Sequence, residues 1–145
     1  MLEQAYILRQ QHGMRRSSGF EQPRPVRWLA SSKTDLSRFP DDVKRRMGFA
    51  LYEAQMGRKA GFAKPLTGYG GAGVLEVVDD FDGDTFRAVY TVRFAGVVYV
   101  LHAFQKKSKR GIATPKAEIG RINQRLQRAA ADYEQWLENE ITKSG

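Results

Sequence analysis

A carboxylate, an imidazole and several cations lie in the middle of this 145-residue sequence: Glu76, Arg87, His102, Lys106 and Lys107. These groups together suffice to break an RNA phosphodiester bond without a metal. The ribose 2′-hydroxyl would lose a proton and attack the adjacent phosphate, cations would hold the developing charge, and an acid would protonate the leaving 5′-oxygen. Glu76 or His102 could transfer the protons, while Arg87 and Lys106 could hold the phosphate.

The net charge of +8 is concentrated in one segment of the chain. Between His102 and Arg128 there are eight lysines and arginines and a single acid, Glu118, which leaves a balance of +7. The other 118 residues hold sixteen basic and fifteen acidic residues and are nearly neutral. A localised basic patch is what a polyphosphate partner requires, although a solvated surface that only keeps the protein soluble is the alternative. We expect five further cations to bind RNA: Arg93, Lys109, Arg110, Lys116 and Arg121.

Several other classes of protein are disfavoured by the composition. There are no cysteines, so neither disulfides nor thiolate metal sites can form. No apolar run approaches the length of about 20 residues that spans a bilayer, and no export signal is visible, so we expect a cytoplasmic protein without a membrane partner. The acids from Asp79 to Asp84 do not fit a calcium loop, and the glycines of residues 57–73 do not fit a nucleotide loop. We expect no metal and no cofactor.

The elements that must position these groups can be predicted from periodicity and turn residues. Residues 26–29 read as a strand, and residues 31–38 and 40–56 read as a helical hairpin. Three strands follow at 74–79, 86–94 and 97–104, joined by tight turns at Asp82-Gly83 and Ala95-Gly96. Thr114 can begin a last helix, whose apolar seam runs from Ile119 to Trp136. The order βααβββα predicts an α+β fold, with a three- to four-stranded, mainly antiparallel sheet packed on the helical hairpin.

The two tight turns predict the register of the sheet. Arg87 should lie opposite Phe104, and Val89 should lie between Glu76 and His102. Since side chains alternate across a strand, one face is apolar and forms the core, and the other carries the polar groups and is partly open. The predicted core face has these members: Leu75, Val77, Phe86, Ala88, Tyr90, Val92, Phe94, Val97, Tyr99, Leu101 and Ala103.

Each candidate has an ordinary structural alternative. Arg87 and Glu76 could simply form a salt bridge, and His102 could be a satisfied strand histidine. The basic run that begins at Lys106 could be a solvated turn.

Three stretches carry a resemblance to a known family: AKPLTGYGGAGVLEV, GDTFRAVYTVRF and YVLHAFQKKSKRGIATPKAEI. Over about residues 26–128 the chain resembles the RelE/HigB-type toxins of bacterial type II toxin–antitoxin modules, in their phage-derived branch. The resemblance implies a RelE-like fold and a toxin that inhibits translation by cutting messenger RNA on the ribosome, without a metal. In that family, catalysis relies on an arginine matching Arg87 and on basic residues matching Lys106, Lys107 and Lys109. We therefore expect Arg87→Ala to relieve growth arrest on expression and to leave the fold intact. It also implies an antitoxin partner, commonly a helix-turn-helix protein of the HigA type.

We therefore divide the chain into an N-terminal extension of residues 1–25, a toxin domain of residues 26–131 and the acidic end of the last helix at 132–145. Two other functions remain open at this point. A non-catalytic module could bind RNA or DNA through phosphate contacts alone. A regulatory protein could use the apolar seam from Ile119 to Trp136 to dock a partner helix, although such a seam usually packs on its own core.

Overall fold

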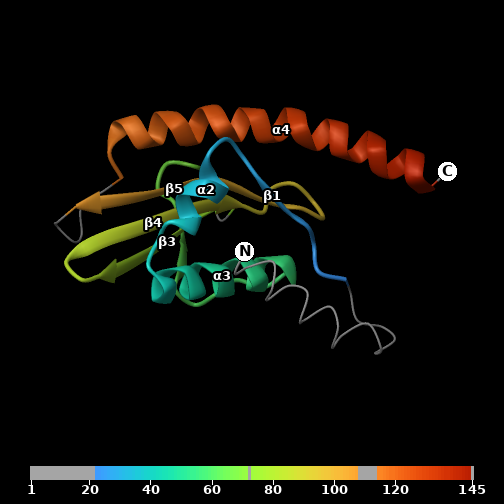
Figure 1. The fold of residues 1–145 in the computed structure, drawn as a ribbon. Helices are drawn as coiled ribbons and strands as arrows, with labels where there is room; N and C mark the ends of the chain where they lie inside the picture. The colour runs from blue at the N-terminus through green and yellow to red at the C-terminus, as the bar shows by residue number, and fades with distance from the viewer. Residues whose placement is uncertain (1–21, 72, 108–113, 145) are drawn as a thin grey trace.

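The computed structural model describes residues 22–71, 73–107 and 114–144. A five-stranded sheet lies between helix α3 on one face and the long helix α4 on the other (Figure 1). The strand order is β1-β5-β4-β3-β2, in which β1 runs parallel to β5 and the other neighbours are antiparallel. The elements run in this order: β1 Val26–Trp28, α2 Ser32–Ser37, α3 Asp41–Gln55, β2 Ala63–Pro65, β3 Val74–Phe81, β4 Asp84–Thr91, β5 Val98–Lys107 and α4 Lys116–Ser144.

The α+β class is as predicted, but the sheet has one strand more than the predicted three to four. The additional strand is β2, which pairs with β3 at the edge of the sheet. Its three residues lie in the glycine-rich segment, where no alternation of apolar and polar residues marks a strand. Hydrogen bonding to β3, rather than local strand propensity, keeps this segment extended.

The hairpin between β3 and β4 forms as predicted. Asp82 and Gly83 both have positive φ angles, 52° and 86°, as the tight turn of a two-residue hairpin requires. Val78 therefore lies opposite Arg87, and Glu76 lies opposite Val89. Glycine suits the second turn position because it adopts positive φ without a steric cost.

The second hairpin differs from the prediction because β5 contains a bulge. Arg87 lies opposite Phe104 and Val89 opposite His102, as predicted, but Tyr90 then pairs with Val100. Leu101 is the extra residue, so every side chain before it moves to the other face. The predicted core face is therefore wrong in part: Val97, Tyr99 and Leu101 pack under α4, while Val98 and Val100 pack on the α3 side.

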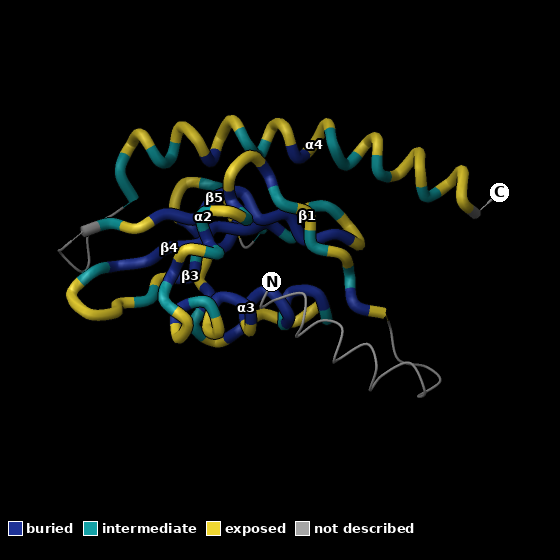
Figure 2. Tube along the Cα trace, in the orientation of Figure 1, coloured by how far each residue is buried: buried dark blue, intermediate teal, exposed yellow. Residues whose placement is uncertain are grey.

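The sheet consequently has a core on each face. On one side, apolar residues of α2 and α3 pack on the inner side chains of β3, β4 and β5. On the other, the seam of α4 closes a second cluster, and Figure 2 shows its sheet-facing side less exposed than its outer side. Helix α4 lies across much of the polar face and leaves a part of it open beside α2, so this face is partly open, as predicted. The members of the seam are Ile119, Ile122, Leu126, Ala129, Tyr133 and Trp136.

Helix α4 is the longest element, with 29 residues and a length of about 43 Å. Its C-terminal turns extend past the sheet, where Ile141 is exposed (Figure 1). Midway along it, Asp132 ties the helix to the sheet by accepting hydrogen bonds from Arg27 Nε at 2.6 Å and from the Tyr99 hydroxyl at 2.6 Å. The predicted boundary at residues 131 and 132 falls inside this continuous helix. No helix in the described part of the chain is both long and apolar enough to cross a membrane.

Candidate functional site

Arg87 lies on the predicted face of the sheet, but the start of α4 covers it. Its side chain is 6% exposed, and its Nη1 donates to Glu76 Oε2 at 2.9 Å and to Thr114 Oγ1 at 3.3 Å. The Thr114 hydroxyl in turn donates to the same Glu76 oxygen at 3.1 Å. The salt bridge between Arg87 and Glu76, one of the two alternatives from the sequence, is therefore present. The Arg87 guanidinium is therefore largely shielded from solvent, with Thr114 as one of its contacts.

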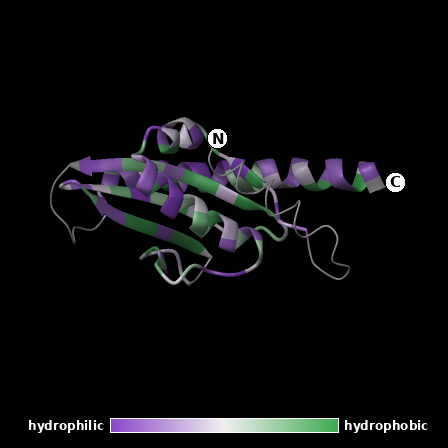
Figure 3. Cartoon of the chain, turned by 60° about the horizontal axis from the view of Figure 1, so that its bottom comes forward, coloured by the Kyte–Doolittle hydropathy of each residue, from purple (hydrophilic) through white to green (hydrophobic). Residues whose placement is uncertain are grey.

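Lys106 is a partly accessible cation on this side of the sheet. It lies opposite Thr85, one pair beyond Arg87 and Phe104, so its side chain belongs to the same face as Arg87. It is partly exposed, and no described residue forms an ion pair with it. The end of β5, with the sequence QKK, is hydrophilic in Figure 3. Lys106 is thus free to hold an anion beside the Arg87 pair.

His102 is held between a guanidinium and a carboxylate. Arg125 Nη1 donates to His102 Nδ1 at 2.8 Å, and His102 Nε2 lies 2.7 Å from Glu118 Oε1. Because a guanidinium can only donate, Nδ1 must be unprotonated, and the proton must be on Nε2, directed at Glu118. The imidazole is therefore neutral, with a defined tautomer. It also stacks on the Phe104 ring, with ring centroids 4.9 Å apart.

The electrostatics agree with a neutral imidazole beside a charged carboxylate. Burial lowers the pKa of His102, and the Arg125 and Arg121 charges lower it further, against the opposing hydrogen bond to Glu118. Burial would raise the pKa of Glu118, but hydrogen bonds from His102 and Arg121 outweigh it and hold that pKa below its ordinary value. Both shifts favour a neutral imidazole and an ionised carboxylate.

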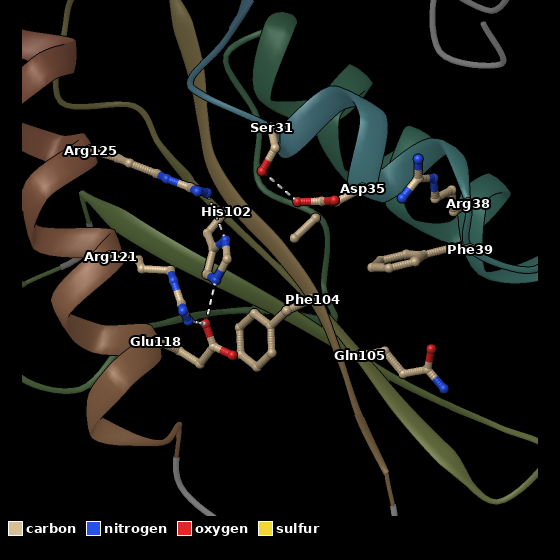
Figure 4. Close-up of a pocket in the computed structure, with 11 residues that line it drawn as sticks. Ser31, Asp35, Arg38, Phe39, His102, Phe104, Gln105, Glu118, Arg121 and Arg125 are labelled. Carbon is tan, nitrogen blue, oxygen red and sulfur yellow. Dashed lines mark hydrogen bonds and ion pairs between the residues drawn. The ribbon is translucent and has the colours of Figure 1, made fainter.

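An open pocket surrounds this pair (Figure 4). The α2–α4 pocket has a volume of about 370 Å³ and lies between α2, the second half of β5 and the first turns of α4. The α4 wall presents Glu118, Arg121 and Arg125, and the α2 wall presents Asp35 and Arg38 (Figure 4). Its other lining residues are Ser31, Phe39, His102, Ala103, Phe104 and Gln105.

The other predicted RNA-binding residues do not all join this region. Arg121 lines the pocket, and Lys116 is exposed in the first turn of α4. Arg93 lies past the opposite end of β4 and donates to the Tyr69 carbonyl at 2.6 Å. The last residue of β4 is about 20 Å along the strand from the partner of Lys106, so Arg93 is remote from the cluster. Lys109, Arg110 and the side chain of Lys107 lie outside the described residues.

Four charged residues of the pocket were not among the sequence candidates: Asp35, Arg38, Glu118 and Arg125. The α4 residues carried a usable signal, because positions 118, 121 and 125 share one face of a helix. These three residues were not grouped in the prediction from the sequence, because Glu118 was treated only as the single acid of a basic segment. No local signal marks Asp35 and Arg38, because the contact of α2 with β5 is a long-range one.

Within the described ranges, no group of three or more histidine, aspartate or glutamate side chains could hold a metal ion. The two carboxylates nearest the cations, Glu76 and Glu118, are each engaged with an arginine. The arrangement instead offers charge stabilisation by cations and proton transfer through the His102–Glu118 pair.

Comparisons with known proteins give one family match. The model of the family described as "Phage derived protein Gp49-like (DUF891)" matches residues 34–127. Among solved structures, a chain of the toxin–antitoxin complex RelBE2 from Mycobacterium tuberculosis is similar at 18% identity and a TM-score of 0.40. That similarity covers 58% of this chain and 99% of the other chain. No curated protein matches the sequence. The family match spans well over half of the chain and includes both walls of the α2–α4 pocket.

Proposed function

Since this chain belongs to the phage-derived Gp49-like family of type II toxins, we propose that it is a ribosome-dependent endonuclease that cuts messenger RNA and so inhibits translation. The family match confirms the RelE-type resemblance found in the sequence and the role as the toxin of a toxin–antitoxin module. The nuclease activity is the proposal. The observation that carries it is the open pocket in which a neutral His102 lies between Glu118 and Arg125, with Lys106 farther along the same face of β5.

In the proposed reaction the His102–Glu118 pair handles the protons. The 2′-hydroxyl gives its proton to this pair as its oxygen attacks the adjacent phosphorus. The bond from phosphorus to the 5′-oxygen then breaks, and that oxygen leaves with a proton as a 5′-hydroxyl. The upstream fragment ends in a 2′,3′-cyclic phosphate, so atoms and charge balance without any further reactant.

Lysine and arginine side chains hold the charge that develops on the phosphate. Lys106 is accessible to it, and its side chain lies on the same face as the Arg87–Glu76 pair. Arg87 would contribute a bidentate fork once the contact with Thr114 opens, and Glu76 would orient that guanidinium. Lys107, Lys109 and Arg110 follow directly in the sequence and are proposed to extend the same binding surface, with Lys116 at the start of α4.

A second function is favoured by a specific observation. Arg87 is engaged with Glu76 and Thr114, and both ring nitrogens of His102 are hydrogen-bonded within the protein. A site closed in this way could bind RNA phosphates through Lys106 and the arginines without cutting. The two functions differ in the fate of the RNA and not in its binding.

The partner of a type II toxin is its antitoxin. We propose that an antitoxin covers or neutralises the basic region around α4, and that it is of the helix-turn-helix type. The ribosome and messenger RNA are the other proposed partners.

Cleavage on programmed ribosomes tests the proposed function. Ribosomes would carry a messenger RNA with the codon of interest in the A site, and the products would be analysed for their ends. We expect a 2′,3′-cyclic phosphate upstream, a 5′-hydroxyl downstream, and no cleavage when the attacking ribose is replaced by 2′-deoxyribose. Intact RNA that remains bound to the protein would instead favour the non-catalytic module.

A further inference from the structure

We propose that the α2 wall of the α2–α4 pocket is a second phosphate site for single-stranded RNA, in which Arg38 acts with Arg121 and Arg125 on the phosphate next to the one that is cut. The inference rests on the proposed function, because it names how the same RNA strand continues beyond the reacting bond. It adds α2, an element that lies at the side of β5 and carries none of the residues assigned to the reaction.

The pocket gathers three guanidinium groups from two separate elements. Arg38 lies at the end of α2, and Arg121 and Arg125 lie one turn apart on α4, all of them lining the same space (Figure 4). Among the described residues, Arg38 has no hydrogen bond or ion pair through its side chain, and it is exposed. Arg38 is therefore available to an anion, and Arg121 and Arg125 line the same pocket from the α4 side.

The two acids in the pocket are both engaged and leave the guanidinium donors in excess. Asp35 Oδ2 accepts from the Ser31 hydroxyl at 2.7 Å. Glu118 Oε1 accepts from His102 Nε2 and from Arg121 Nη1 at 2.8 Å. Arg125 uses one terminal nitrogen, Nη1, for both His102 and the Leu101 carbonyl. Each guanidinium has five N–H donors in a planar fork, so donors remain that match phosphate oxygens.

The electrostatic balance of these arginines favours an added anion. Burial lowers the pKa of Arg125; the Asp35 charge raises it, and the neighbouring Arg121 and Arg128 charges lower it. A lowered pKa in an arginine means that its charged form is disfavoured by its surroundings. A phosphate in the pocket would offset that repulsion.

The dimensions and the floor of the pocket fit one nucleotide of a strand. A volume of about 370 Å³ lies at the small end of the range for ligand sites, which is about 300–1,000 Å³. The stacked rings of His102 and Phe104 form part of the floor of the pocket. Lys106 follows Phe104 by two residues on the same strand, β5. A strand whose phosphate is held by Arg38 would therefore continue along β5 toward Lys106. We favour RNA over an acidic segment of a protein because the pocket is this small and is bordered by the residues of the reaction.

Binding of a non-cleavable strand tests this inference. The probe is a fluorescent 2′-O-methyl oligoribonucleotide, measured by anisotropy over a range of salt concentrations with the full chain. The variant is Arg38→Ala, and the matched control is Arg45→Ala, an exposed arginine of α3 that pairs only with a residue of its own helix among those described. We expect Arg38→Ala to weaken binding about tenfold. We also expect it to reduce the slope of log K against log salt by about 0.7, the value for one phosphate contact on a single strand. The control should match the wild type.

Three results would overturn the inference: no RNA binding by the wild type, unchanged binding by Arg38→Ala, or an equal loss in the control. Arg38→Ala that keeps RNA binding but loses affinity for the antitoxin would assign the α2 wall to that protein, and would equally overturn it. The cleavage assay on programmed ribosomes separates the two proposals. RNA that binds through Arg38 but is never cut would refute the nuclease and leave this site standing. If Arg38→Ala changes neither cleavage nor RNA binding, the nuclease proposal stands and the second phosphate site is refuted.

Discussion

Replacing Arg87 by methionine separates its structural role from its proposed role in catalysis. Methionine replaces the aliphatic part of the side chain but removes the guanidinium and its charge, so Glu76 and Thr114 lose their partner. Removing one partner of a buried ion pair costs about 3–5 kcal/mol, because the other charge is left uncompensated. The Arg87 side chain is 6% exposed and that of Glu76 is 17% exposed, so we take the lower end, about 3 kcal/mol.

That cost should be visible as a fall in melting temperature. For a domain of this size, 1 kcal/mol corresponds to about 3 °C, so Arg87→Met should melt about 10 °C below the wild type. This revises the expectation from the sequence that the fold would be unaffected. In the double variant Glu76→Gln with Arg87→Met, no charge is left alone, and the glutamine oxygen can still accept from Thr114. We expect most of the lost stability to return.

The assay combines melting curves with cleavage on programmed ribosomes, at a temperature where all variants are folded. If Arg87 holds phosphate, both the single and the double variant stay inactive although the double variant is stable. A double variant that regains stability and cleavage together would show that Arg87 only supports the fold. A loss below about 1 kcal/mol in Arg87→Met, similar to that in the exposed control Arg45→Met, would refute the reasoning from burial.

Three further predictions concern stability. Asp132→Asn should cost about 1–2 kcal/mol in urea unfolding, because the pair with Arg27 is partly exposed, and an unchanged midpoint would exclude this tie as a stabilising contact. The wild type should lose stability as the pH falls below about 6.5, because the unfolded chain binds a proton at His102 more readily than the folded one. His102→Gln should reduce this dependence of stability on pH between about pH 7.5 and 5.5. An equal slope in both proteins would contradict a lowered pKa of His102. Gly83→Ala should lower the free energy of unfolding by about 1–2 kcal/mol, because alanine is strained at a φ of 86°. No steric clash adds to this cost, since nothing lies within 4 Å of the added methyl group. A neutral effect would argue against the two-residue turn.

Much of the fold could be predicted because its determinants are local. The positive-φ turn at Asp82 and Gly83 set the register of β3 and β4, and the spacing of the α4 seam predicted which side of that helix is buried. The error in the second hairpin arose from one extra residue, Leu101, which no turn signal marks. Because side chains alternate, that single residue exchanged the faces of the first part of β5.

The site was predictable where it depended on the sheet and not where it depended on the helices. The register placed Arg87, Glu76 and His102 on one face, as predicted. It could not show that α4 crosses this face, since the placement of a helix depends on long-range packing. Glu118 and Arg125 gain their roles only through that placement.

Mapping the 5′ ends of cellular RNA after brief expression tests the central proposal most directly. RNA from cells expressing the wild type would be compared with RNA from cells expressing His102→Gln at the same protein level. We predict new 5′-hydroxyl ends inside translated reading frames, which appear within minutes and are strongly reduced in the variant. Growth arrest by the wild type without any new ends in translated messages would contradict the account.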